Sequence, residues 1–366
     1  MGERGGGEEP LLSHKKVTGW ATQQEVLGYD IDTESMTIAL PARKVDELRA
    51  RLAAEWPVGR QTASVKEVLV LAGKLHHASF VIRPGRYFVR RLLQLTNLHL
   101  NGAERAGGGG AWGRYRKQAE ARRIVRLSRE FMADVGWWRW FLGRGGGYGG
   151  EKITAPSFSF VKQLPSRTWF SDASLTAIGG LCMETGVYWR FDLPEEVQKR
   201  TIRGGQAVDD LISINLLEVM AMVMTAYVMV DMRGDRPVRK GEAVLMRADN
   251  EAAVTWVKRC RGGGKKQVRV GALMIMMGTL EARGGWCFQA RHVRGVDNRL
   301  ADGLTRWKVE QIPGRLNAEC PEITWQVQDL GDKEQQMCSE ILREGMPSEE
   351  LQLRLERLTR RIGGCG

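Results

Sequence analysis

The sequence has no run of about 18 apolar residues, the minimum that a membrane-spanning helix needs. Its most apolar stretch, 216–230, contains Glu218 and is followed by Asp231, so we expect no membrane partner. Residues 1–10, MGERGGGEEP, are too charged and too rich in glycine for a secretory signal. The six cysteines form no CxxC pair, which argues against a zinc module or a disulfide framework. We therefore expect an intracellular protein, cytoplasmic or nuclear.

Acidic charge is scarce in the first part of the chain. Residues 1–150 hold 24 Lys and Arg residues and 15 Asp and Glu residues, whereas residues 151–366 hold 31 and 28. A basic region beside a nearly neutral one is typical of proteins that bind a polyanion. For any single Lys or Arg, generic solubilising charge is the better explanation. Hydrophobic residues make up 43% of the chain, which is enough for a packed core.

Two glycine-rich segments, 107–110 and 143–150, interrupt the chain, and the second is the predicted domain boundary. We expect a disordered N-terminus over 1–17, a first region over 18–142 and a linker over 143–150. A second domain would cover 151–308. A polar tail would cover 309–366, with one helix near 348–361.

The first region is predicted to be mainly helical. Alternating apolar residues predict a hairpin that turns around 32–35. Apolar residues at helical spacing then predict helices over 41–56, after 62–64 and over 86–95, and a further basic and aromatic segment covers 122–142.

The second region has a different pattern. Short apolar runs predict strands over 167–172, 177–183, 187–191, 243–248 and 286–292, and longer ones predict helices over 214–230, 250–258, 271–281 and 298–307. This order of elements predicts a mixed α/β domain with a five-stranded sheet and flanking helices.

Four carboxylates lie at the edges of these apolar runs. Asp172 ends the first strand, Glu218 lies in the long apolar helix, Asp249 follows the fourth strand, and Asp302 lies in the last helix. Each Asp alone fits a turn or a helix cap, but an acid within an apolar helix needs a partner. Together the four would form an all-oxygen site for Mg²⁺ or Mn²⁺, and two such ions about 4 Å apart can cleave a phosphodiester.

Neighbouring residues extend this candidate site. Small residues follow Asp172, among them Ser174 and the Gly179–Gly180 pair, which we expect to let a nucleic-acid backbone approach. A basic segment follows the fourth strand and its helix, and a solvated loop is its simplest alternative explanation. Its candidate nucleic-acid contacts are Lys258, Arg259, Arg261, Lys265 and Lys266.

The motifs FSDAS, NLLE, ADN and HVRGVDNRLADGLTR resemble the ribonuclease H domain of retrotransposon reverse transcriptases, particularly DIRS and Ngaro-like elements. The resemblance implies a ribonuclease H-like fold whose acids Asp172, Glu218, Asp249 and Asp302 hold two Mg²⁺ ions, with Mn²⁺ as a substitute. In that family a His lies ten residues before the last Asp, with an Asn between them. His292 and Asn298 keep this pattern, whereas Asp297 is out of register. His292 would assist catalysis, and Ser174 and Asn298 would contact the nucleic acid.

The first region resembles the thumb and connection of the same polymerases through VLGYDIDTESMTIALPARKVDELRARL. The aromatic-x-Asp-Asp hairpin of the catalytic palm is absent before Gly28, so no polymerase activity is expected from this chain alone. The resemblance implies cleavage of the RNA strand of RNA·DNA hybrids, with other parts of a retroelement polymerase as partners. One alternative is a silent nucleic-acid-binding remnant. Another is a transposase or integrase, although those enzymes use acids in the order Asp, Asp, Glu.

Overall fold

The computed structural model describes residues 19–90, 92, 93, 95, 121–143, 154–155, 164–202, 211–231, 242–260, 268–284 and 286–343. The predicted disordered N-terminus, most of the predicted linker and the predicted helix near 348–361 lie outside these residues. Within the described ranges, every helix is too short or too polar to cross a membrane.

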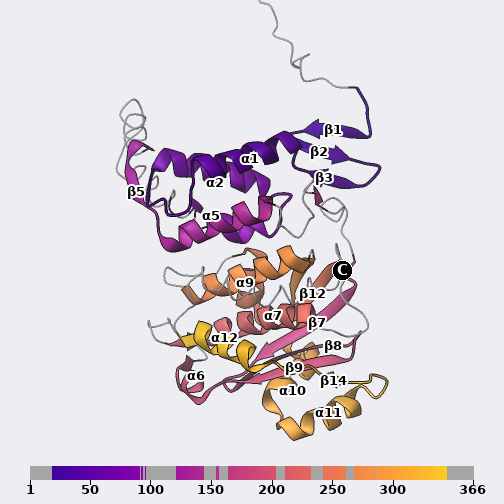
Figure 1. Ribbon diagram of the computed structural model, residues 1–366. Helices are drawn as coiled ribbons and strands as arrows, with labels where there is room; N and C mark the ends of the chain where they lie inside the picture. The colour runs from indigo at the N-terminus through magenta and orange to yellow at the C-terminus, as the bar shows by residue number, and fades with distance from the viewer. Residues whose placement is uncertain are drawn as a thin grey trace, which may run out of the picture.

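The first region opens with an antiparallel sheet of four short strands (Figure 1), β1 (Gln23–Val26), β2 (Tyr29–Asp32), β3 (Thr37–Ala39) and β6 (Thr154–Ala155). The predicted hairpin is present, and the backbone amides of Glu34 and Ser35 both donate to Asp32 at its turn. An earlier hairpin was not predicted. Its turn has Leu27 and Gly28 at φ of 51° and 79°, the left-handed pair that suits a two-residue hairpin. Strand β6 lies beyond the predicted linker, so residues 154–155 belong to this first sheet.

The rest of the first region is helical, with α1 (Ala42–Ala54), α2 (Val65–Ala78), a helix over described residues between 85 and 95, and α5 (Arg129–Leu142). Strands β4 (Thr62–Ser64) and β5 (Ile124–Arg126) pair antiparallel, which brings the start of α2 next to the segment before α5. Helix α2 begins with a capping box, in which Ser64 accepts from the Glu67 amide and Glu67 accepts from the Ser64 amide. Buried apolar residues such as Leu71, Leu75 and Trp138 hold these helices together.

The second region contains a mixed six-stranded sheet in the order β13-β12-β7-β8-β9-β14. Strands β7 (Arg167–Ala173), β8 (Ala177–Cys182) and β9 (Val187–Asp192) form an antiparallel meander. Strands β12 (Ala243–Ala248) and β13 (Cys287–His292) add to it in parallel on the side of β7. The prediction of a mixed α/β domain is confirmed, and all five predicted strands are present.

The sixth strand, β14 (Gln326–Val327), was not predicted. It pairs in parallel with β9 and comes from the segment expected to be a polar tail. The same segment forms a 3-10 helix (Val309–Gln311) and two α-helices, α11 (Ile312–Glu319) and α12 (Asp332–Arg343). Leu316, Ile341 and Leu342 are fully buried, so residues 312–342 are folded onto the domain and the prediction of a polar tail from 309 was wrong for this part.

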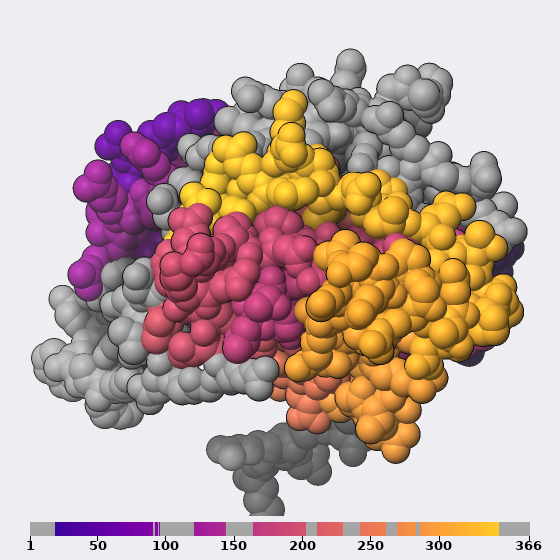
Figure 2. Space-filling model, turned by 90° about the horizontal axis from the view of Figure 1, so that it is seen from below, coloured from indigo at the N-terminus to yellow at the C-terminus, as the bar shows by residue number. Residues whose placement is uncertain are grey.

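Helices cover both faces of the sheet (Figure 1). On one face lie α7 (Ile214–Asp231), which packs on β7 and β8, and α9 (Val268–Gly284) behind it. On the other face lies α10 (Arg299–Arg306), where Leu304 packs with Leu181, Tyr188 and Leu316. Figure 2 shows this face, with the amber atoms of α10 and α11 beside the pink atoms of the strands. The remaining elements are α6 (Glu195–Lys199), α8 (Glu251–Lys258), a 3-10 helix (Gly295–Asp297), and the paired strands β10 (Thr201–Ile202) and β11 (Ile212–Ser213).

One hydrophobic core extends through both regions, and a smaller separate cluster lies at α10 and α11. Figure 1 shows α9 between α7 and the helices of the first region. Gly278 of α9 lies so close to Tyr87 that an added Cβ would be 2.6 Å from that ring. Arg83 pairs across this interface with Glu281, which is 3% exposed. Burial raises the pKa of Glu281 to about 7, and the charge of Arg83 opposes this rise.

We expect Gly180→Ala in β8 to lower the free energy of unfolding by about 1–3 kcal/mol. Its new methyl group would lie 2.6 Å from Thr225 Oγ1 and 2.8 Å from Trp189 Nε1, two atoms that form a buried hydrogen bond. Denaturant unfolding measures the change. The matched control is Gly73→Ala in α2, where an added Cβ meets nothing within 4 Å and helix propensity predicts a gain of up to about 1 kcal/mol. Equal effects at the two positions would contradict this account of the packing.

Candidate metal centre

Three of the four predicted acids meet at one end of the sheet. Strands β7 and β12 are parallel neighbours, with Arg247 opposite Phe170. Asp172, near the end of β7, and Asp249, directly after β12, are therefore brought to the same edge. Glu218 reaches this edge from α7. Each of the three carboxylates offers an oxygen, and these oxygens all lie within 4.8 Å of one another.

Two of these acids are almost completely buried, with Asp172 3% and Glu218 4% exposed. Burial raises the pKa of Asp172 to about 7, against a lowering hydrogen bond from Thr305, and Asp249 raises it further. Burial also raises the pKa of Glu218 well above its usual value, and Asp172 and Asp249 add to the effect. Three carboxylates so close together stabilise one another's protonated forms unless a cation neutralises them.

The chemistry of these residues fits a divalent metal ion. All three candidate ligands are carboxylate oxygens, the ligand type that Mg²⁺ and Mn²⁺ prefer. Glu218 Oε2 is buried and has no hydrogen-bond partner, and such an oxygen usually has one in a native structure. A bound cation would give this oxygen its missing partner. The three acids could therefore hold a metal ion, and their oxygens do not distinguish Mg²⁺ from Mn²⁺.

Asp302, the fourth predicted acid, lies near the three-acid cluster but is paired with Arg306. Its charge contributes to the raised pKa values of Asp172, Glu218 and Asp249, yet its Oδ1 accepts a hydrogen bond from Arg306 Nε at 2.6 Å. The Arg306 side chain is 52% exposed and that of Asp302 is 39% exposed. An ion pair this exposed contributes only about 0–1 kcal/mol, so a divalent ion can displace Arg306 at little cost.

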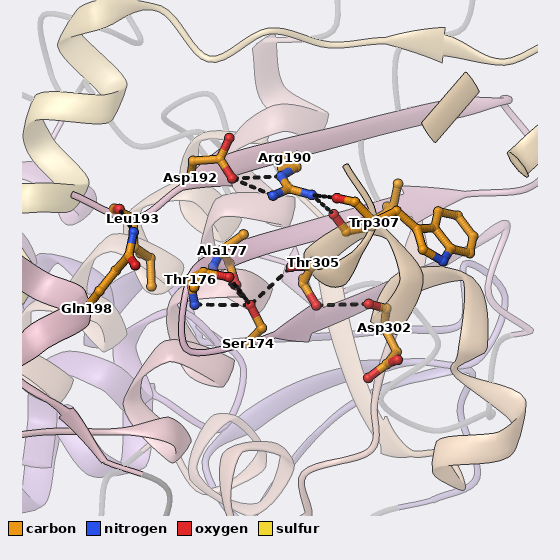
Figure 3. A network of polar contacts seen from close by, with 11 residues as sticks. Ser174, Thr176, Ala177, Arg190, Asp192, Leu193, Gln198, Asp302, Thr305 and Trp307 are labelled. Atoms are coloured by element: carbon orange, nitrogen blue, oxygen red, sulfur yellow. Dashed lines mark hydrogen bonds and ion pairs between the residues drawn. The ribbon is translucent and has the colours of Figure 1, made fainter. Parts of the chain in front are cut away.

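Helix α10, which carries Asp302, is fixed to the sheet at several points (Figure 3). Arg190 Nη1 of β9 donates to the carbonyl oxygens of Leu304 and Trp307, both at 2.7 Å, and Ser174 Oγ donates to the Thr305 carbonyl at 3.1 Å. The Thr305 hydroxyl donates to Asp172 Oδ2 at 2.7 Å. These bonds set the distance between Asp302 and the three-acid cluster.

His292 lies at the rim of this cluster, at the carboxyl end of β13. Its side chain is exposed, and its Nε2 lies 3.0 Å from the backbone carbonyl oxygen of Asp249. Because a carbonyl oxygen can only accept, Nε2 is the donor in this contact, and Nδ1 is the ring nitrogen left for another partner. The structure thus brings His292 next to Asp249, whereas the sequence pattern had linked it to Asp302.

The side chains of two predicted nucleic-acid contacts are buried and form hydrogen bonds within the protein. Asn298 is 1% exposed and donates through Nδ2 to the Ser171 carbonyl oxygen at 3.1 Å, which joins the start of α10 to β7. Ser174 is 8% exposed, and its hydroxyl accepts from the Thr176 and Ala177 amides. Both side chains hold the scaffold in place and present almost no surface to a ligand, so the burial does not support their predicted role.

The Gly179–Gly180 pair also has an internal explanation. An added Cβ at Gly179 would lie 3.0 Å from the Trp189 carbonyl oxygen, and one at Gly180 would collide with Thr225. Strand and helix packing therefore explains these glycines, and the approach of a nucleic-acid backbone stays a prediction. Gly295 is the glycine that lies at the centre itself, since an added Cβ there would be 3.3 Å from Asp249 Oδ2.

The predicted basic contacts are only partly described. Lys258 ends α8 and Arg259 follows it, and both are exposed. Arg261, Lys265 and Lys266 lie outside the described residues. Asp297, which sequence reasoning rejected as a ligand, pairs instead with Arg294 Nε at 2.8 Å.

Sequence reasoning missed the residues that orient the ligands. Asn250 caps α8 by accepting from the Ala253 amide, and it donates to Asn215 Oδ1 at 2.8 Å. Asn215 precedes Glu218 by one helical turn of α7, so this bond ties the end of β12 to the helix that carries Glu218. The ADN motif contained the signal, because an Asn between a strand and a helix is a typical N-cap. Thr305 and Arg306 had no comparable signal.

No family model matches this chain, and no curated protein matches it. The resemblance to ribonuclease H therefore rests on the sequence motifs.

We expect Glu218→Gln to stabilise the metal-free protein, by more than about 1 kcal/mol at pH 8 and by less at pH 5. The pKa of Glu218 is well above 4.5 in the folded chain, so the folded state keeps a proton that the unfolded state loses above that value. Wild-type stability therefore falls as pH rises, and Gln avoids this loss. Thermal unfolding in a chelator at both pH values measures it. Glu310→Gln, at an exposed position, is the control, and a pH-independent effect of Glu218→Gln would contradict a raised pKa as its cause.

Proposed function

We propose that this chain is a metal-dependent endonuclease that hydrolyses the RNA strand of RNA·DNA hybrids, as the ribonuclease H part of a retroelement reverse transcriptase. One observation carries the proposal: the oxygens of Asp172, Glu218 and Asp249, from three separate elements, lie within 4.8 Å of one another. Burying like charges in this way costs free energy. Binding of cations by these acids would explain why they are clustered despite that cost.

The order of the elements supports the same reading. Asp172 is on the first strand of the six-stranded sheet, Glu218 on the first long helix after the meander, Asp249 directly after the fourth strand, and Asp302 in the first turn of α10. This is the order that the resemblance implies for ribonuclease H. A transposase or integrase would need a Glu as the last acid, where this chain has Asp302.

The side chains divide the chemistry between them. Divalent ions bound here would supply the charge that activates water and stabilises the leaving oxygen. Asp172, Glu218 and Asp249 would hold the first ion, and Asp302, once released by Arg306, would turn toward a second. His292, with Nδ1 left for another partner, would assist proton transfer at the rim.

Charge outside the acidic centre suits a nucleic-acid duplex. The first 150 residues carry the excess of basic side chains, and such side chains neutralise phosphates whatever the sequence. Lys258 and Arg259 add exposed positive charge at the end of α8. Selection of RNA over DNA would come from contacts to 2′-hydroxyls across a wide, shallow minor groove.

The rival candidate is a silent nucleic-acid-binding remnant of a retroelement, and one observation favours it. Asp302 is paired with Arg306 and not with the other three acids. Because that pair is exposed and weak, we favour the enzyme, and a cleavage assay decides between the two.

Asp249→Asn is expected to reduce cleavage of the RNA strand of a labelled hybrid by more than about 100-fold, because loss of a group behind a metal ligand already costs about 10- to 100-fold. Hybrid binding should be nearly unchanged. Asp297→Asn, which alters an acid paired with Arg294, is the matched control and should cleave normally. Tight, salt-sensitive binding with no cleavage by the wild type would mean the remnant.

Mg²⁺ should raise the melting temperature of the wild type without any substrate. A ligand at about 100 times its dissociation constant stabilises a protein by about 2.7 kcal/mol. Asp249→Asn should lose most of this gain and Asp297→Asn none of it. Equal stabilisation of all three proteins by Mg²⁺ would place the ion elsewhere and remove the three-acid site as its explanation.

A further inference from the structure

A groove separate from the acidic centre runs between the two regions. One part, of about 460 Å³, lies between the end of α2 and the end of α8, and a second part, of about 260 Å³, continues beside β13. The two parts share the lining residues Arg86, Lys258 and Cys260, so they are adjacent, and we call them together the inter-region groove.

Positive charge dominates the larger part of this groove. Arg86 and Arg90 come from the first region, and Lys258 and Arg259 from the end of α8. The described residues that line this part include no Asp or Glu. Basic residues contributed by both regions to one concave surface make a binding site for phosphate groups.

An aromatic side chain stands among these cations. Phe80, two residues after the end of α2, is 52% exposed although it is a large apolar residue. Its ring lies 5.2 Å from the ring of Tyr29, which in turn packs edge-on against His77 at 4.3 Å. The Tyr29 hydroxyl donates to the His77 carbonyl oxygen at 2.8 Å. Tyr29, His77 and Phe80 thus form one aromatic cluster in the lining of the groove.

We propose that the inter-region groove binds single-stranded nucleic acid, with a base stacked on Phe80 and the adjacent phosphates on Arg86, Lys258 and Arg259. An aromatic platform beside cations is the arrangement that binds unpaired bases, whereas the base faces of a duplex are stacked and inaccessible. A cleft of about 460 Å³ has the size of a small-ligand site, which suits one or two nucleotides.

The groove also lies in a useful place relative to the acidic centre. Helix α8 joins the two, since it begins after Asn250, beside Asp249, and ends at Lys258. Its eight residues span about 12 Å at 1.5 Å per residue. A single-stranded extension held in the groove would therefore continue from a nucleic acid bound at the acidic centre. The groove itself shares no residue with the three-acid cluster, so this proposal does not depend on cleavage.

The test is the binding of fluorescent oligonucleotides of about 12 nucleotides to the full chain, in a chelator so that nothing is cut. Single-stranded DNA, single-stranded RNA, an RNA·DNA hybrid and a DNA duplex are compared by anisotropy. Phe80→Ala should weaken single-strand binding at least about 5-fold, the lower end of what one stacked base contributes. Phe80→Trp should restore it, and neither change should affect the two duplexes.

Charge variants complete the test. Lys258→Ala combined with Arg259→Ala should reduce the slope of log affinity against log salt by about 1.4 for single strands. Lys199→Ala combined with Lys333→Ala, at two exposed positions on α6 and α12, removes the same charge elsewhere and should leave that slope unchanged. Asp249→Asn should bind single strands like the wild type. This binding result does not depend on whether the chain cleaves hybrids.

Two results would overturn the proposal. One is single-strand binding that Phe80→Ala does not weaken, which would reduce the groove to a nonspecific charged surface. The other is an equal loss for single strands and duplexes in Phe80→Ala, which would mean that the residue contributes to a duplex path. Because Phe80 is half exposed, its replacement leaves the core intact, and an unchanged melting temperature verifies this.

Discussion

Repulsion among buried carboxylates is the constraint around which the second region is built. Glu218 projects from α7, a helix that is otherwise buried and apolar over most of its length, toward two further acids at the ends of β7 and β12. Charges at this separation are tolerated only where the scaffold holds them rigidly or a cation joins them. Much of the surrounding polar structure holds the acids, or the elements that carry them, rigidly in place. Thr305 binds Asp172, Asn250 binds Asn215 on the Glu218 helix, and Arg190 fixes the end of α10.

The packing that holds the acidic centre continues into the first region. Helix α9 lies between α7 and the helices near Tyr87, with Gly278 allowing their close approach. A continuous core connects the residues that hold Glu218 with those that line the inter-region groove. Movement of one region against the other would have to break this core, so the acidic centre and the groove keep a fixed relation. A ligand spanning both would meet a surface that is already organised.

Local sequence patterns predicted the main strands, the long helices and the acids, because each of these has a signal within a few neighbouring residues. Glu218 stood out because its helix is otherwise apolar, and Asp249 because it lies between a strand and a helix. Thr305 could not be predicted, since its partner Asp172 is 133 residues away and a Thr within a helix is unremarkable alone. Strand β14 has two exposed residues and no periodicity to detect. Ser174 and Asn298 were given a role in binding because sequence does not reveal burial.

Strand β14 affects how the domain can fold during its synthesis. It covers the start of the open edge of β9 at Val187 and Tyr188, and the Gln328 amide extends the pairing by donating to the Tyr188 carbonyl oxygen at 2.8 Å. During synthesis the meander emerges long before residue 326, so β9 waits as an uncovered edge that can pair with another chain. A gene shortened after Lys308 would keep all the acids and still lose this cover. Aggregation, and not loss of catalytic groups, would then limit such a protein.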